Sequence, residues 1–171
     1  MPEKYSFTCD CCGKTYDEMP LCFGSEYPDY YFSIPEEERK TRIELTESLC
    51  IIDDHYFHRG QIEIPIIDYS ENLIFNVWTT ISKKNFELRN ELWNKPDRVK
   101  QEPYFGWLQT LIPTYENTLN ITTIARENEV GYIPTIDIVE DNHTLQYDQQ
   151  NGITFETAAS KVNTILKEWH T

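Results

Sequence analysis

The sequence is poor in basic residues, and this shortage excludes more functions than any motif supports. Fifteen lysines and arginines face 29 aspartates and glutamates, so the formal net charge at pH 7 is −14. A surface with this balance repels phosphate backbones, which argues against a nucleic-acid partner. The same surface would attract a basic protein, because opposite charges accelerate the encounter of two proteins.

Long apolar segments and common catalytic signatures are also missing. No apolar run approaches the roughly 20 residues of a membrane-spanning helix, and Met1-Pro2-Glu3-Lys4 lacks the apolar segment of a secretory signal. The chain has no glycine-rich phosphate loop, dinucleotide fingerprint, H-E-x-x-H or G-x-S-x-G motif. We therefore expect no membrane partner and no nucleotide cofactor, and we expect none of the common nucleotide enzymes, zinc proteases or serine hydrolases.

The cysteines form the most chemically specific pattern in the chain. Cys9, Cys11 and Cys12 crowd together near the start, and Cys9-x-x-Cys12-Gly13 has the form of a zinc knuckle, in which a tight turn directs two thiolates at one metal. The total of five cysteines is odd, which fits a reducing compartment better than a disulfide framework, so we expect a cytoplasmic protein.

A closed zinc site needs four ligands, and no second C-x-x-C follows the first. We take Cys9, Cys12 and Cys50 as the candidate ligands, and the candidates for the fourth position are Cys11, Cys22, His55 and His58. Zinc is therefore a possible cofactor of the N-terminal segment. The alternative is that Cys50 is a small buried apolar residue of a strand, as unpaired cysteine often is.

Length and composition indicate one folded domain. The 171 residues suffice for one hydrophobic core, and 39% are apolar and 13% aromatic, which argues against disorder. We expect a single domain over 1–171, with an irregular, knuckle-like segment over 1–32 and a body over 33–171.

The body alternates between strand and helix patterns. Two strands are predicted over 49–53 and 56–67 around the Asp53-Asp54 turn, and further strands over 73–81, 104–111, 118–126 and 132–139. Helices are predicted over 34–42 after a Ser33–Glu36 capping box, over 82–93 after Ser82, and after Thr154. These elements predict an α+β fold, with a mostly antiparallel sheet covered by two or three helices.

Three residues outside the knuckle are candidates for chemistry. Arg59 stands before a glycine within a strand, His143 lies in a loop after two acidic residues, and Cys50 is close to two histidines in the sequence. An enzyme would need these side chains to converge. Arg59 and His143 are also candidates for binding an anion or a partner. The structural alternatives are that Arg59 pairs with Asp53 or Glu63, that His143 makes a hydrogen bond within the fold, and that Cys50 belongs to the core.

Aromatic residues offer a second kind of site. Tyr104 and Trp107 belong to the run Tyr104-Phe105-Gly106-Trp107, and tyrosine and tryptophan are frequent anchors of protein interfaces. The alternative is that this run is part of the core.

Several short motifs run from one end of the chain to the other. They include Cys9-x-x-Cys12-Gly13, Leu21-x-Phe23-Gly24, Cys50-x-Ile52-Asp53, Phe57-x-Arg59-Gly60, Tyr104-Phe105-Gly106-Trp107-Leu108, Pro113-x-Tyr115 and His143-x-Leu145. Together they resemble an uncharacterised bacterial family, domain of unknown function 2199. The resemblance implies a bacterial, cytosolic protein and brings no established activity. Two positions depart from the family pattern, because Tyr16 and Asn142 replace a histidine and an aspartate that the family favours.

Three hypotheses of function follow. The leading one is an acidic, non-enzymatic domain that binds another protein, for example an immunity protein that neutralises a basic toxin. The second is a structural module stabilised by zinc. The third is an enzyme of unknown reaction that uses Arg59, His143 and Cys50.

Overall fold

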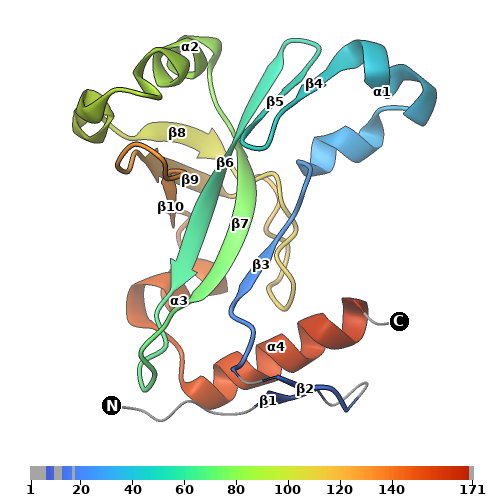
Figure 1. Cartoon of the computed structure of the whole chain (residues 1–171), viewed down its shortest axis with the longest axis vertical. Helices are drawn as coiled ribbons and strands as arrows, with labels where there is room; N and C mark the ends of the chain where they lie inside the picture. Colours follow the sequence, from blue (N-terminus) through green and yellow to red (C-terminus); the bar gives the residue numbers. More distant parts are fainter. Residues whose placement is uncertain (1–6, 10–12, 17, 170–171) are drawn as a thin grey trace.

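One mixed eight-stranded sheet organises the protein. The computed structural model describes residues 7–9, 13–16 and 18–169. The main path of the sheet follows the order β3-β7-β6-β10-β9-β8, and β5 joins β6 on one side and β4 on the other (Figure 1). The strands are β3 (Cys22–Gly24), β4 (Ile43–Leu45), β5 (Leu49–Ile52), β6 (His55–Ile64), β7 (Leu73–Thr80), β8 (Tyr104–Trp107), β9 (Thr122–Arg126) and β10 (Thr135–Ile138).

The central strands confirm the period-two pattern of the sequence. β5 and β6 pair antiparallel around the predicted turn at Asp53 and Asp54, and β6 pairs antiparallel with β7 from Phe57 to Ile64. Asp53 has a φ of +55°, a left-handed conformation that Asp tolerates better than most residues do. Together with the helices described below, these strands confirm the predicted α+β class.

The sheet is mixed because two of its pairings are parallel. β3 pairs with β7 and β10 pairs with β6 in parallel. The expectation of a mostly antiparallel sheet did not include these pairings, since residues far apart in the sequence make them.

The sheet also curls so that the C-terminal part of β7 meets the C-terminal end of β8. An antiparallel bridge joins Thr79 of β7 to Leu108. The Gln109 N–H donates to the Trp78 carbonyl at 2.7 Å, and the Trp107 N–H donates to the Thr80 hydroxyl at 2.9 Å. The strands β7, β6, β10, β9 and β8 therefore surround a common interior.

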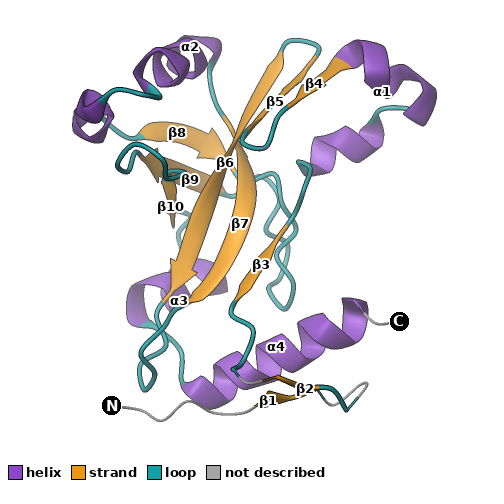
Figure 2. Ribbon diagram, viewed as in Figure 1, coloured by secondary structure: helices purple, strands orange, loops and turns teal. Residues whose placement is uncertain are grey.

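Helices close this interior at both ends (Figure 2). α2 (Lys83–Leu92) and the 3-10 helix η2 (Pro96–Lys100) lie beside the start of β8, and α3 (Thr144–Asn151) and α4 (Phe155–Trp169) lie at the opposite end. Ser82 caps α2 as predicted, by accepting a hydrogen bond from the Asn85 N–H at 3.1 Å. Thr154 caps α4 as predicted, by accepting from the Thr157 N–H at 3.1 Å.

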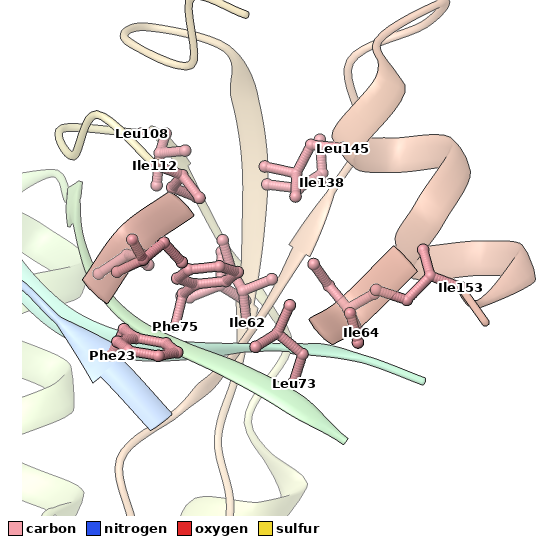
Figure 3. Packing of buried hydrophobic residues seen from close by; sticks show 14 of the residues in the cluster. Phe23, Ile62, Ile64, Leu73, Phe75, Leu108, Ile112, Ile138, Leu145 and Ile153 are labelled. Atoms are coloured by element: carbon pink, nitrogen blue, oxygen red, sulfur yellow. The ribbon is translucent and has the colours of Figure 1, made fainter. Parts of the chain in front are cut away.

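The main core lies between the strands and the two C-terminal helices. The apolar face of α4 is buried through Ala158, Val162, Ile165 and Leu166, whereas Trp169 at its end is 57% exposed. In Figure 3 the apolar side chains point toward one another, and they include Phe23, Ile62, Ile64, Leu73, Phe75, Leu108, Ile112, Ile138, Leu145 and Ile153.

A second, smaller core lies on the other face of the central strands. It consists of Ile34, Cys50, Ile52, Phe57 and Trp78. The 3-10 helix η1 (Asp29–Ser33) packs against it through Tyr30 and Tyr31, and α1 (Glu36–Arg42) follows in the chain. Alternation along a strand explains the two cores, because Phe57 and Ile62 lie on opposite faces of β6 and belong to different cores.

Two local predictions for the N-terminal part were wrong. The segment expected to be irregular contains β1 (Phe7–Thr8), β2 (Thr15–Tyr16) and β3. The capping box before α1 does not form, since Pro35 occupies the N-cap and the Ser33 hydroxyl instead donates to the Tyr30 carbonyl at 2.6 Å.

Candidate functional site

The structure separates the candidate zinc ligands. Cys9 is buried in the main core, Cys50 is buried in the second core, and Cys22 is exposed on β3. Cys11 and Cys12 lie outside the described residues. Within the described part of the chain, no three His, Cys, Asp or Glu side chains are grouped so that they could hold a metal.

The two candidate histidines point in different directions. His55 is exposed at the β5–β6 turn, where its ring contacts the Tyr30 ring edge-on at 5.1 Å. His58 is completely buried, and desolvation, with a smaller contribution from the nearby positive charge of Arg89, lowers its pKa to about 3. His58 is therefore neutral at physiological pH.

The residues of the enzyme hypothesis occupy three different environments. The Cys50 thiol is buried in the second core, and desolvation raises its pKa to about 12, which opposes a nucleophilic thiolate. The Arg59 guanidinium donates to the Glu47 carbonyl at 3.4 Å. Asp53, which we considered as a partner for Arg59, instead accepts from Arg42 at 2.7 Å.

His143 has a structural position at the start of α3. Its Nδ1 accepts a hydrogen bond from the Leu145 N–H at 3.1 Å and so caps the helix. Because Nδ1 is the acceptor, Nε2 carries the proton and donates to the Glu116 carbonyl at 2.9 Å. His143 thus ties the first turn of α3 to the 116–117 loop, at the end of the molecule opposite β5 (Figure 1).

Of the two aromatic candidates, only Trp107 reaches the surface. Side chains alternate along β8, so Tyr104 is buried whereas Phe105 and Trp107 are 50% and 48% exposed. The Phe105 and Trp107 rings meet edge-on at 5.3 Å. The expectation that Tyr104 anchors a partner is therefore wrong, because its ring faces the interior of the curled sheet.

Phe105 and Trp107 border a groove of about 650 Å³, which we call the aromatic groove. The turn between β5 and β6, the end of β7, the start of α2 and β8 form its walls. Its lining residues are Asp54, His55, Tyr56, Thr80, Ile81, Ser82, Lys83, Phe105, Gly106 and Trp107.

A strongly acidic segment borders this groove. Residues 36–54, which we call the acidic arm, comprise α1, β4, β5 and the first part of the turn, and they lie together in Figure 1. All seven acidic residues of the arm are exposed, whereas of its three basic residues only Lys40 is exposed. Arg39 lies over the Tyr31 ring at 4.6 Å, and Arg42 forms ion pairs with Asp53 and Glu38.

A buried ionic cluster lies beneath α2. Arg89 of α2, Arg98 of η2, Glu127 after β9, His58 and Tyr104 are all buried. Arg98 approaches Glu127 at 3.4 Å and donates to the Tyr132 carbonyl at 2.7 Å.

Both arginines of this cluster lie against the ring of Trp93. The Arg89 guanidinium lies 4.3 Å from the centre of the Trp93 ring and that of Arg98 lies 4.4 Å from it. Sequence reasoning missed the cluster, since charged residues on a helix normally face solvent. The available signal was weak: Arg89 lies three residues after Phe86 and four before Trp93, on what proves to be the inward face of α2.

The motifs identified in the sequence belong to a single family. A family model described as "Uncharacterized protein conserved in bacteria (DUF2199)" matches residues 8–153. The chain belongs to this family. The match covers every strand of the large sheet and ends just before α4. No curated protein and no solved structure matches the chain. None of the described helices has the length and apolar character needed to cross a bilayer.

Proposed function

We propose that the protein is a non-enzymatic domain that binds a basic protein through the aromatic groove and the acidic arm. The pair of half-exposed rings at the edge of the groove, Phe105 and Trp107, is the observation on which the proposal rests. Tryptophan in particular is frequent among the few residues that dominate binding energy.

Charge supports a basic partner. The acidic arm has no exposed basic residue except Lys40, and the whole chain has a net charge of −14. Such a surface accelerates association with a positively charged protein and disfavours acidic competitors. An immunity protein that neutralises a basic toxin is the most concrete form of this proposal.

Affinity capture with matched variants tests the proposal. The wild-type domain, Trp107→Ala and Tyr147→Ala would be immobilised and exposed to lysate of the source cell at low salt, and the captured protein would then be purified for affinity measurement. Tyr147 is the control because it is 65% exposed on α3, at the other end of the molecule.

We expect wild type and Tyr147→Ala to retain the same basic protein. Trp107→Ala should weaken its binding about thirtyfold, which is the effect of losing a typical aromatic hot spot. Binding should also weaken steeply as salt increases. Equal affinities of wild type and Trp107→Ala, or capture of no basic protein by the wild type, would contradict the proposal.

A zinc-stabilised module is the second candidate, and the backbone hydrogen bonds that join Cys9 to Gly13 and Lys14 favour it. The Cys9 N–H donates to the Lys14 carbonyl at 2.8 Å, and the Gly13 N–H donates back to the Cys9 carbonyl at 2.9 Å. Gly13 has a φ of +70°, which glycine adopts readily.

Metal analysis of protein purified without chelator tests this candidate. About one zinc per chain is expected in the wild type and little in Cys9→Ser. Cys50→Ala should keep its zinc, because Cys50 lies in a different core from Cys9. A wild-type protein without zinc would exclude the module, and loss of zinc from Cys50→Ala would show that the two cysteines share a metal.

A further inference from the structure

The buried ionic cluster contains more positive than negative charge. Arg89 and Arg98 contribute two positive charges, and Glu127 contributes one negative charge. The neutral His58 adds none. Arg98 is paired with Glu127 at 3.4 Å, so the charge of Arg89 has no hydrogen-bonded counterion among the described residues.

Hydrogen-bond donors also outnumber acceptors in this cluster. The atoms without a partner in the described chain include the donors Arg89 Nε and Nη2, Arg98 Nε and the Tyr104 hydroxyl. Neutral His58 has one donor nitrogen and one acceptor nitrogen, and both are without a partner. Glu127 Oε2 is a further acceptor without a partner. The donors therefore need an additional acceptor.

The groups of the cluster are neighbours around Arg89. Arg89 interacts electrostatically with Glu127, Arg98 and Tyr104, and it also acts on the pKa of His58. The His58 and Tyr104 rings face each other edge-on at 6.0 Å. Glu127 attracts Arg89 as well, but it is paired with Arg98 and offers one negative charge to two arginines.

A buried charge without a counterion destabilises the folded state. Water could accept hydrogen bonds from Arg89, but it would leave the positive charge uncompensated. We propose that the cluster binds one small monovalent anion of the size of chloride, held by the guanidinium of Arg89 and the hydroxyl of Tyr104. One negative charge makes the cluster neutral, whereas a sulfate or phosphate dianion would leave excess negative charge in the interior.

Thermal unfolding of the full chain tests this site. Sodium chloride would replace sodium gluconate from 0 to 100 mM at constant ionic strength, so that only the identity of the anion changes. Ligand binding to the folded state raises Tm, and a site with a Kd on the order of 10 mM should raise it by about 3–6 °C over this range.

Three variants distinguish this site from a general salt effect. Arg89→Met should abolish the dependence of Tm on chloride. Glu127→Gln removes the competing negative charge and should strengthen chloride binding about tenfold. Arg126→Met is the matched control, because Arg126 precedes Glu127 but is 54% exposed and pairs with Asp137 on the surface; its chloride dependence should equal that of the wild type.

Bromide provides a second measurement that does not rely on any variant folding. Wild-type crystals soaked in sodium bromide should give an anomalous peak within hydrogen-bond distance of Arg89. The proposal fails if the Tm of the wild type is the same in chloride and gluconate, or if the bromide map contains only water beside Arg89. The proposal also fails if Arg89→Met keeps the dependence of Tm on chloride and Arg126→Met loses it, because the anion would then bind elsewhere.

Discussion

Acid should destabilise the protein through a single buried histidine. Burial, assisted by the charge of Arg89, lowers the pKa of His58 from 6.5 to about 3. Above pH 6.5 the side chain is neutral in both the folded and the unfolded chain, so it brings no penalty. As the pH falls from 6.5 to 3, the unfolded chain binds a proton that the folded chain does not, and stability is lost.

The difference between the two pKa values sets the size of this loss. Each pH unit between 6.5 and 3 costs about 1.4 kcal/mol of unfolding free energy. The loss at pH 5 is therefore about 2 kcal/mol relative to pH 7.5, and it approaches roughly 5 kcal/mol near pH 3.

Urea unfolding at pH 7.5 and pH 5 measures this contribution. Carboxyl groups also titrate as the pH falls. The relevant quantity is therefore the loss of unfolding free energy in the wild type minus the loss in His58→Phe. We expect a difference of about 2 kcal/mol. His55→Phe is the control, because the His55 side chain is 57% exposed, and its pH dependence should follow that of the wild type.

An equal loss of stability in wild type and His58→Phe would refute this reasoning. So would ring signals of His58 that titrate near pH 6.5 in the folded protein, as followed by NMR. Either result would mean that water or an acidic group solvates the histidine despite its burial.

Three further predictions concern packing, thiol chemistry and helix capping. Gly106→Ala should destabilise the protein by about 3 kcal/mol in urea unfolding, because a Cβ there would collide with the carbonyl oxygen of Thr80; an unchanged midpoint would argue against closure of the sheet at this point. Alkylation at pH 8 followed by peptide mass spectrometry should modify Cys22 in the native protein and Cys50 only after unfolding, because Cys22 is exposed and burial raises the pKa of Cys50 to about 12. Ser82→Ala should cost about 1 kcal/mol of unfolding free energy by removing the cap of α2, and a change below measurement error would show that the cap is not needed.

The candidate site was only partly accessible from the sequence. Trp107 was identified as a possible anchor from its residue type, and it is half exposed on β8. Tyr104 belongs to the same short run, and only the orientation of β8 shows that it faces inward while Trp107 faces outward. The groove itself joins the β5–β6 turn to α2 and β8, and no local pattern reports that proximity.

The ionic cluster was inaccessible for a different reason. Arg89, Arg98 and Glu127 come from three separate segments, and each by itself resembles an ordinary surface charge. Their burial follows from the way α2 and η2 cover the end of the curled sheet.

The amino-acid sequence alone determined the features that depend on neighbouring residues. Alternating apolar residues specified β5, β6 and β7, and Ser82 and Thr154 specified the starts of α2 and α4, because periodicity and capping act over a few positions. The tertiary structure alone decided which distant segments pair, including the parallel partners of β3 and β10 and the contact of Thr79 with Leu108. Backbone hydrogen bonds are alike for every strand, so the choice of partner depends on how the whole chain packs.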